Sequence, residues 1–189
     1  MSDEVGESKK SLRRELLNRV RGLQHQRPEL DEALSSRLRS LPELTNTSSI
    51  MAFAPLPSEP QIDLVVDAWF ESHRFVLLPK VETTPGTMVP VLLDRILAEL
   101  DRDALGIRTP AGPTWNEKID LILLPGCGFD EHLQRLGRGG GYYDRFLAEQ
   151  PDAIKVGICF ECQLIDRLPS EPHDQSVDLL VTEERVLGR

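Results

Sequence analysis

The chain has 189 residues, of which 28% are charged and 40% are hydrophobic, so it can bury one hydrophobic core as a single domain over residues 1–189. Its formal net charge of -9, from 22 basic and 31 acidic side chains, disfavours nonspecific attraction to nucleic acid or anionic lipid. No run approaches the roughly 18 apolar residues of a membrane span, and the N-terminus lacks an apolar leader. We therefore expect a cytoplasmic protein that binds neither nucleic acid nor a membrane.

Helices and strands alternate along the first part of the chain. Residues 8–24 carry apolar side chains at helical spacing with basic residues between them, and a second short helix is predicted over residues 28–40. A strand over residues 48–54 ends in a proline-rich turn. Apolar residues at i, i+3, i+4, i+7 and i+8 then predict a helix over residues 62–70, and residues 74–79 form the next strand.

The second part of the chain continues this alternation after an irregular segment. Residues 81–118 mix turn residues with apolar runs, and we expect an edge hairpin or excursion there. Residues 119–126 read as a strand covered on both faces, a helix begins near Tyr142, and two further strands are predicted over residues 154–160 and 177–183. This pattern predicts a three-layer α/β domain with a mostly parallel sheet, which binds ligands beyond the carboxyl ends of its strands.

A glycine-rich loop, "GRGGGYYDRF" at residues 137–146, lies at such an end. Glycine can adopt positive φ and gather backbone N–H groups around an anion, and the guanidinium groups of Arg135 and Arg138 match phosphate oxygens. A helix beginning near Tyr142 would point its positive end the same way, and Asp144 could hold Mg²⁺. The loop fits neither a Walker A motif nor a dinucleotide fingerprint, and its composition alone fits a flexible turn as well as a phosphate cradle.

The three cysteines, Cys127, Cys159 and Cys162, do not form a disulfide framework. Cys159 and Cys162 make a C-x-x-C after a predicted strand, so a thiol redox protein is an alternative hypothesis. The simpler interpretation is two small, mostly buried thiols.

The block "LLPGCGFDEHLQRLGRGGGYYDRFL", residues 123–147, closely resembles the signature of the 5-formyltetrahydrofolate cyclo-ligase family, also called 5,10-methenyltetrahydrofolate synthetases. The segments "KKSLRREL", "PLPSEPQID", "LLPK" and "RLPSEPHDQSVDLLVTE" follow the family's order, from about residue 9 to residue 183. The resemblance implies a fold similar to the NagB/RpiA/CoA transferase-like fold. It also implies ATP-dependent conversion of 5-formyltetrahydrofolate to 5,10-methenyltetrahydrofolate, with release of ADP and phosphate, through phosphorylation of the formyl oxygen and ring closure.

The resemblance also assigns roles to individual residues. It implies that ATP is bound by Lys9, Lys10, Ser11, Leu12, Arg13, Arg135, Leu136, Gly137, Arg138, Gly139, Gly140, Gly141, Tyr142 and Tyr143. It implies that the folate is bound by Ala54, Glu59, Arg138, Gly139, Gly140, Gly141 and Tyr142. Arg138 and Tyr142 would be catalytic, and Asp144 and Asp174 would be associated with Mg²⁺.

This chain departs from the family pattern at two positions. Gly140 stands where some members carry lysine, and Leu105 aligns with an aromatic residue that stacks on the folate, a role that Trp115 could take over. A relative that binds nucleotide or folate without turnover is an alternative, but it should have lost a charged site residue, and none is lost. We expect a monomer or weak homodimer that acts on 5-formyltetrahydrofolate, which can be polyglutamylated.

Overall fold

Parallel strands form the centre of the main sheet in the computed structural model, which describes residues 2–45, 47–82, 84, 86–103 and 106–188. In these ranges the sheet has seven strands in the order β10-β9-β7-β4-β1-β2-β3. The parallel strands are β9 (Leu179–Val181), β7 (Ile154–Ile158), β4 (Leu121–Pro125), β1 (Ser49–Met51) and β2 (Phe75–Val81). The edge strands β3 (Met88–Leu92) and β10 (Val186–Gly188) run antiparallel to their neighbours. The structure therefore confirms the α/β fold with a mostly parallel sheet.

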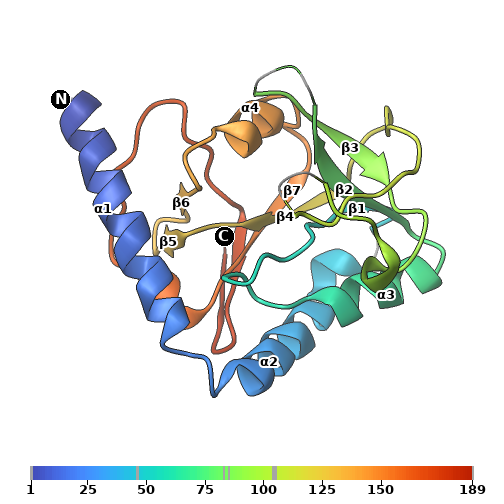
Figure 1. The fold of residues 1–189 in the computed structure, drawn as a ribbon, viewed down its shortest axis with the longest axis horizontal. Helices are drawn as coiled ribbons and strands as arrows, with labels where there is room; N and C mark the ends of the chain where they lie inside the picture. Colours follow the sequence, from blue (N-terminus) through green and yellow to red (C-terminus); the bar gives the residue numbers. More distant parts are fainter. Residues whose placement is uncertain (1, 46, 83, 85, 104–105, 189) are drawn as a thin grey trace.

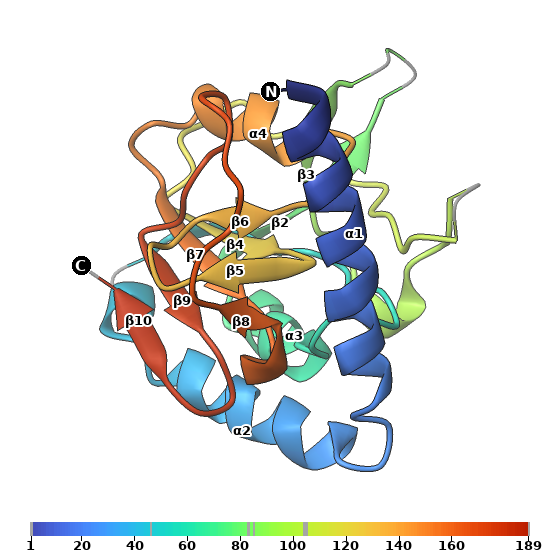
Figure 2. The ribbon, with the colours of Figure 1, turned by 90° about the vertical axis from the view of Figure 1, so that its left-hand side faces the viewer.

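Helices cover both faces of this sheet. In Figures 1 and 2, α2 (Arg27–Arg39) and α3 (Asp63–Glu71) lie below the sheet, and α4 (Tyr142–Ala148) lies above it. Strand β4 shows why two faces must be covered, because Leu121 and Leu123 belong to the lower cluster, whereas Ile122 and Leu124 belong to the upper one. A continuous apolar strand of this kind needs an apolar layer on each side.

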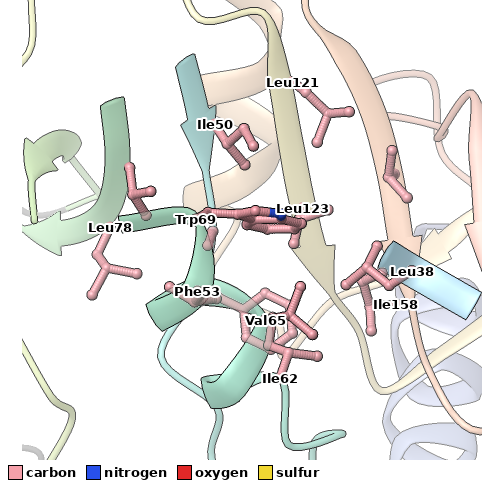
Figure 3. Packing of buried hydrophobic residues seen from close by; sticks show 14 of the residues in the cluster. Leu38, Ile50, Phe53, Ile62, Val65, Trp69, Leu78, Leu121, Leu123 and Ile158 are labelled. Carbon is pink, nitrogen blue, oxygen red and sulfur yellow. The ribbon is translucent and has the colours of Figure 1, made fainter. Parts of the chain in front are cut away.

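In the lower layer, α3 packs on the sheet through apolar residues spaced along one face of the helix. Val65, Val66 and Trp69 are buried, while Leu64 on the outer side of the helix is 74% exposed. Figure 3 shows Val65 and Trp69 packed with Ile50 of β1 and Leu123 of β4.

Helix α1 (Ser2–Arg21) packs beside a second, smaller sheet of β5 (Gly128–Asp130), β6 (Arg135–Leu136) and β8 (Leu164–Ile165), as Figure 2 shows. Leu16 of α1 is buried with Cys127, Leu136 and Leu168. A Cβ atom at Gly128 would overlap the Leu16 side chain, so glycine at this position lets the helix approach. This contact brings α1 to the loops that follow β4.

The outlines predicted from the sequence differ from the structure in detail. Helix α1 starts at Ser2 and ends at Arg21, earlier at both ends than predicted, because residues 22–26 form turns. Strand β1 is shorter than residues 48–54: it ends at Met51, and Ala52 makes one last backbone hydrogen bond, to Leu77 O of β2 at 2.8 Å. The hairpin of β2 and β3 confirms the edge hairpin expected after residue 81. Among the described residues, no helix has the length and apolarity required to cross a membrane.

The strand order places a topological switch point between β1 and β4. From β1 the chain adds β2 and β3 on one side, then returns to place β4, β7 and β9 on the other. Loops that leave β1 and β4 diverge at this point, and α/β sheets bind ligands in the crevice so formed.

Candidate active site

A cavity of about 290 Å³ opens beyond the carboxyl ends of β1, β2 and β4, at the switch point. Its wall combines residues after β1 and β4, residues of the β2–β3 hairpin and the glycine-rich loop. Those that bear on the argument are Phe53, Ala54, Leu56, Glu59, Pro79, Val81, Met88, Ile107, Arg108, Arg135, Gly137, Arg138, Gly140, Gly141, Tyr142, Tyr143 and Asp144. The wall therefore combines apolar side chains with glycines and charged groups.

The glycine-rich loop presents unpaired backbone N–H groups. Gly139 has φ +100° and Gly141, which precedes α4, has φ +65°. The loop is fixed through its carbonyl oxygens, because Arg13 Nε donates to Gly137 O at 2.7 Å and Arg145 Nη2 donates to Gly140 O at 2.7 Å. Within the described part of the chain, the N–H groups of residues 138–141 have no hydrogen-bond acceptor. Such a group of donors can bind an anion.

Arg138 links the loop to Glu59 across the cavity. Its Nε and Nη2 atoms donate to Glu59 Oε1 at 3.1 and 2.9 Å, and Nη2 also donates to Ser58 Oγ at 2.8 Å. Glu59 is 4% exposed, and its Oε2 accepts the N–H of Leu56 at 3.0 Å. The carboxylate is thus held by partners on both oxygens while it lines the cavity wall.

Two further cations near the loop are each paired with an acid. Arg135 is buried and donates from Nη2 to Asp144 Oδ1 at 2.8 Å. Lys9 of α1 donates to Asp174 Oδ2 at 2.6 Å and to Glu171 Oε2 at 2.8 Å. Burial alone would lower the pKa of Lys9, but its hydrogen bonds to Asp174 and Glu171 outweigh burial and raise it. Both cations are therefore paired with carboxylates of the protein itself, and those that pair with Lys9 come from a distant part of the sequence.

The two aspartates expected at a magnesium site lie in adjoining segments. Asp144 Oδ1 also accepts the N–H of Gln175 at 3.3 Å, which places it beside the residue that follows Asp174. Among the described residues, Asp144 Oδ2 takes no hydrogen bond, and Asp174 Oδ1 faces His173 Nε2 at 3.9 Å. The free oxygen of Asp144 suits Mg²⁺, which binds one or two carboxylates together with substrate phosphates. Asp174 instead groups with Glu171 and His173, whose ligand atoms lie within 4.8 Å of one another.

Some residues assigned from the resemblance do not point into the cavity. Lys10 is exposed and pairs with Glu7 at 3.7 Å, and the Leu12 and Leu136 side chains pack against the apolar cluster under α1. At Gly140, a Cβ atom would lie 2.8 Å from the ring of Tyr142, so a lysine here would require that ring to move.

Other cavity residues were missed by sequence reasoning, notably Phe53 and Met88. Phe53 could have been found, since it follows a central strand at its carboxyl end. Trp115 does not replace an aromatic residue in the cavity wall, because its ring packs in a tilted arrangement against Phe75, with the ring centroids 4.8 Å apart. Leu105, where stacking was expected to be weaker, lies outside the described residues.

The C-x-x-C segment lacks the features of a redox site. Cys159 is fully buried, and burial with the nearby charge of Glu183 raises its pKa. The same two causes raise the pKa of Cys162 to about 11. A short 3-10 turn (Glu161–Gln163), rather than a helix that starts at Cys159, follows the strand. Reactive cysteines have lowered pKa values, so this environment disfavours thiolate chemistry.

Comparison with known proteins identifies consistent relatives. The model of the 5-formyltetrahydrofolate cyclo-ligase family matches residues 5–183. The chain is 28% identical over 194 residues to the 5-formyltetrahydrofolate cyclo-ligase of Mus musculus, which covers 95% of this chain and 96% of the mouse protein. It is 31% identical over 145 residues to that of Mycolicibacterium smegmatis, covering 72% and 74%. The structure of Aquifex aeolicus 5,10-methenyltetrahydrofolate synthetase superposes with a TM-score of 0.83 at 33% identity, covering 95% and 92%.

Proposed function

This chain belongs to the 5-formyltetrahydrofolate cyclo-ligase family and is an enzyme of 5,10-methenyltetrahydrofolate synthesis, and we propose that it phosphorylates the formyl oxygen of 5-formyltetrahydrofolate with ATP. Two neighbouring features carry this proposal. The N–H groups of residues 138–141 have no acceptor in the part of the chain that the structure describes, and the side chain of Arg138 donates to the buried Glu59. A phosphate cradle and a folate-facing carboxylate thus share one cavity.

The chemistry explains why two substrates must meet there. The formyl group of the substrate is amide-like, so its carbon is a weak electrophile and its oxygen a poor leaving group. In the proposed first step, the γ-phosphorus of ATP forms a bond to the formyl oxygen, its bond to the bridging oxygen breaks, and ADP leaves. The bridging aniline nitrogen then attacks the formyl carbon and loses its proton. The carbon–oxygen bond breaks last, phosphate takes the electron pair, and 5,10-methenyltetrahydrofolate remains.

Positioning and charge neutralisation are the main tasks of a protein in phosphoryl transfer. We assign the N–H groups of residues 138–141 to the transferred phosphate and Arg138, with Tyr142, to the reacting oxygen between phosphate and folate. Glu59 and Ala54 would contact the folate, and Lys9, Arg13 and Arg135 would approach the remaining phosphates. Mg²⁺ held by Asp144 and Asp174 would neutralise phosphate charge when bound. No nucleophilic side chain is required.

Binding of the nucleotide would require an exchange of partners. In the structure Lys9 is held by Asp174 and Arg135 by Asp144, so two of the three cations proposed to approach the phosphates are each paired with a proposed metal ligand. Phosphate oxygens would take over the cations while the metal took over the carboxylates. We therefore expect Mg²⁺ and ATP to bind more tightly together than separately.

A direct assay tests the proposal. Purified protein is mixed with 5-formyltetrahydrofolate, ATP and Mg²⁺, and the near-ultraviolet absorbance of the conjugated methenyl product is followed, with ATP omitted as a control. ATP-dependent growth of that band is expected. A flat trace from protein that still binds ATP or the folate would favour a non-turning-over relative instead.

Three finer points stay predictions. The family match over residues 5–183 supports one domain across the chain. We retain the expectation of a monomer or weak homodimer, which sedimentation would test. A preference for polyglutamylated substrate would appear as a lower KM for the pentaglutamate than for the monoglutamate.

A further inference from the structure

Helix α2 presents a polar stripe to the segment that carries Glu59. Arg27, Asp31 and Ser35 lie four residues apart, so they share one face of the helix. Arg27 donates to the carbonyl oxygens of Pro57 at 3.2 Å and Glu59 at 2.6 Å. Asp31 Oδ1 accepts the N–H of Gln61 at 2.9 Å, and Ser35 Oγ lies 3.4 Å from Gln61 O. The three side chains thus hold the backbone on both sides of Glu59.

The stripe is itself well fixed. The guanidinium of Arg27 lies over the buried ring of Phe160, 4.6 Å from its centroid, and its Nε is 3.6 Å from Asp31 Oδ2. The Arg27 and Asp31 side chains are 17% and 15% exposed, so water competes little for these contacts. Hydrogen bonds from a charged donor in such surroundings are stronger than those between neutral groups.

The segment that the stripe holds has little regular structure of its own. Residues 55–61 contain three prolines and form a turn in which the Glu59 N–H donates to Leu56 O at 2.9 Å. Leu56 and Glu59 both line the cavity, whereas Arg27, Asp31 and Ser35 do not. The backbone that carries Glu59 is therefore held by contacts made from outside the cavity.

We propose that Arg27, supported by Asp31, is a positioning residue that holds the Glu59 carboxylate where it can contact the folate. This inference rests on the proposed function, in which Glu59 faces the substrate. Without the two carbonyl contacts, the backbone of Glu59 would shift relative to Arg138 and the glycine-rich loop. Displacements of about 1 Å are enough to weaken binding or catalysis strongly. The loss should fall on the folate and spare ATP, because the stripe does not touch the nucleotide loop.

The test replaces Arg27 with methionine, which retains length and packing on Phe160 but cannot donate. We expect KM for 5-formyltetrahydrofolate, and its dissociation constant measured by calorimetry without ATP, to rise about tenfold. The KM for ATP should change less than about twofold. Arg27→Lys, which can still donate to one carbonyl, should recover part of the affinity.

Arg37→Met is the matched control. Arg37 lies on the same helix and donates to a backbone carbonyl, that of Glu183 at 3.1 Å, but this acceptor belongs to a different segment. The control should lose a comparable amount of thermal stability and leave the folate KM unchanged. If Arg27→Met behaves like Arg37→Met, Arg27 is merely structural and the inference is wrong.

Two more variants separate this inference from the proposed function. Asp31→Asn keeps the shape of the stripe, weakens the bond to Gln61 and should raise the folate KM by about two- to fivefold, which provides a test if Arg27→Met does not fold. Glu59→Gln should raise the folate KM, and combined with Arg27→Met it should be non-additive. An effect of Glu59→Gln with none from the stripe would overturn the positioning role alone. Wild-type protein that neither turns over nor binds the folate would overturn the proposed function.

Discussion

Two loops leave neighbouring parallel strands at the same edge of the sheet, and their structures differ sharply. The loop after β4 runs from Gly126 to the glycine-rich loop, and the loop after β7 contains Cys159 and Cys162. In the described structure, the first leaves the N–H groups of residues 138–141 without acceptors. In the second, the side chain of Gln163 accepts from Phe160 N at 3.0 Å and donates to the carbonyl of Cys127 at 3.0 Å.

The second loop is therefore closed by its own side chains and serves as a support for the first. Position at the carboxyl edge of the sheet is shared by both, so position alone does not create a binding site. The difference lies in whether the polar groups of the loop already have partners within the protein, because groups that are already hydrogen-bonded to the protein offer nothing to a ligand. Substitutions in the two loops should accordingly have very different effects.

The largest effect is expected for Arg138→Ala in the first loop. This change removes the cation assigned to the reacting oxygen between phosphate and folate and leaves the buried Glu59 without its cationic partner, so kcat/KM should fall by about 100-fold or more. The matched control is Arg185→Ala beside the second loop, where Arg185 pairs with Glu161 at 2.6 Å and is 45% exposed. The methenyl absorbance assay should show the control within about twofold of wild type. If Arg138→Ala kept nearly the wild-type rate, the glycine-rich loop would be no more important for the reaction than the loop after β7.

A smaller effect is expected for Gly139→Ala. At φ +100° an alanine is strained by about 1–2 kcal/mol, and relief of that strain would rotate the N–H groups out of the cradle. We expect KM for ATP to rise about tenfold. Gly106→Ala is the control, since Gly106 has φ +78° with open space around it and lies outside the loop. Equal ATP KM values in the two variants would mean that the conformation of Gly139 has no role in nucleotide binding.

Lys9→Met should affect stability in a pH-dependent way. The raised pKa of Lys9 means that its ion pairs stabilise the fold below the usual lysine value of 10.5 and that this stabilisation is lost as pH rises through the folded-state pKa. At pH 8 the free energy of unfolding of the variant should be about 1–2 kcal/mol lower than that of wild type, because Glu171 and Asp174 lose the cation that pairs with them. Denaturant unfolding at pH 8 and above pH 11 would measure this, and the gap between wild type and variant should narrow at the higher pH. A constant gap would point to lost packing instead.

The sequence predicted the fold well wherever elements were long enough to show periodicity. Helix α3 carries at least five apolar residues on nine positions, strand β4 is a continuous run of four, and both formed close to the predicted ranges. Strands β5, β6 and β8 have two or three residues each, too few for any period to appear, and they were missed. Helix α1 packs on this small sheet with Leu16 against Gly128, a contact between distant segments that composition does not reveal.

Some residues of the candidate site stand out in the sequence and others do not, again because contacts between distant segments are not visible there. The glycine-rich loop is visible in composition, whereas Glu59 and Asp174 were found only through the family resemblance, because an isolated acid in a loop looks like an exposed one. The pairing of Lys9 with Asp174 joins residues 165 positions apart. The stripe of Arg27, Asp31 and Ser35 is regular in sequence, yet it cannot be told from a solvated helix face until the segment that it holds is seen.

The smallest effect is expected in the second loop, for replacement of Cys159 and Cys162 together by alanine, which avoids burying a hydroxyl. The cyclo-ligase reaction needs no thiol, so kcat/KM should stay within about twofold of wild type. With a pKa of about 11, Cys162 is almost entirely protonated at pH 8, and iodoacetamide should alkylate it far more slowly than a free cysteine until the pH approaches that value. Rapid alkylation at pH 8, or loss of turnover in the double variant, would show that the second loop carries chemistry after all. Slow alkylation together with full activity would confirm that the loop after β7 carries no chemistry. Its polar groups already have partners within the protein, and its role is to support the loop after β4.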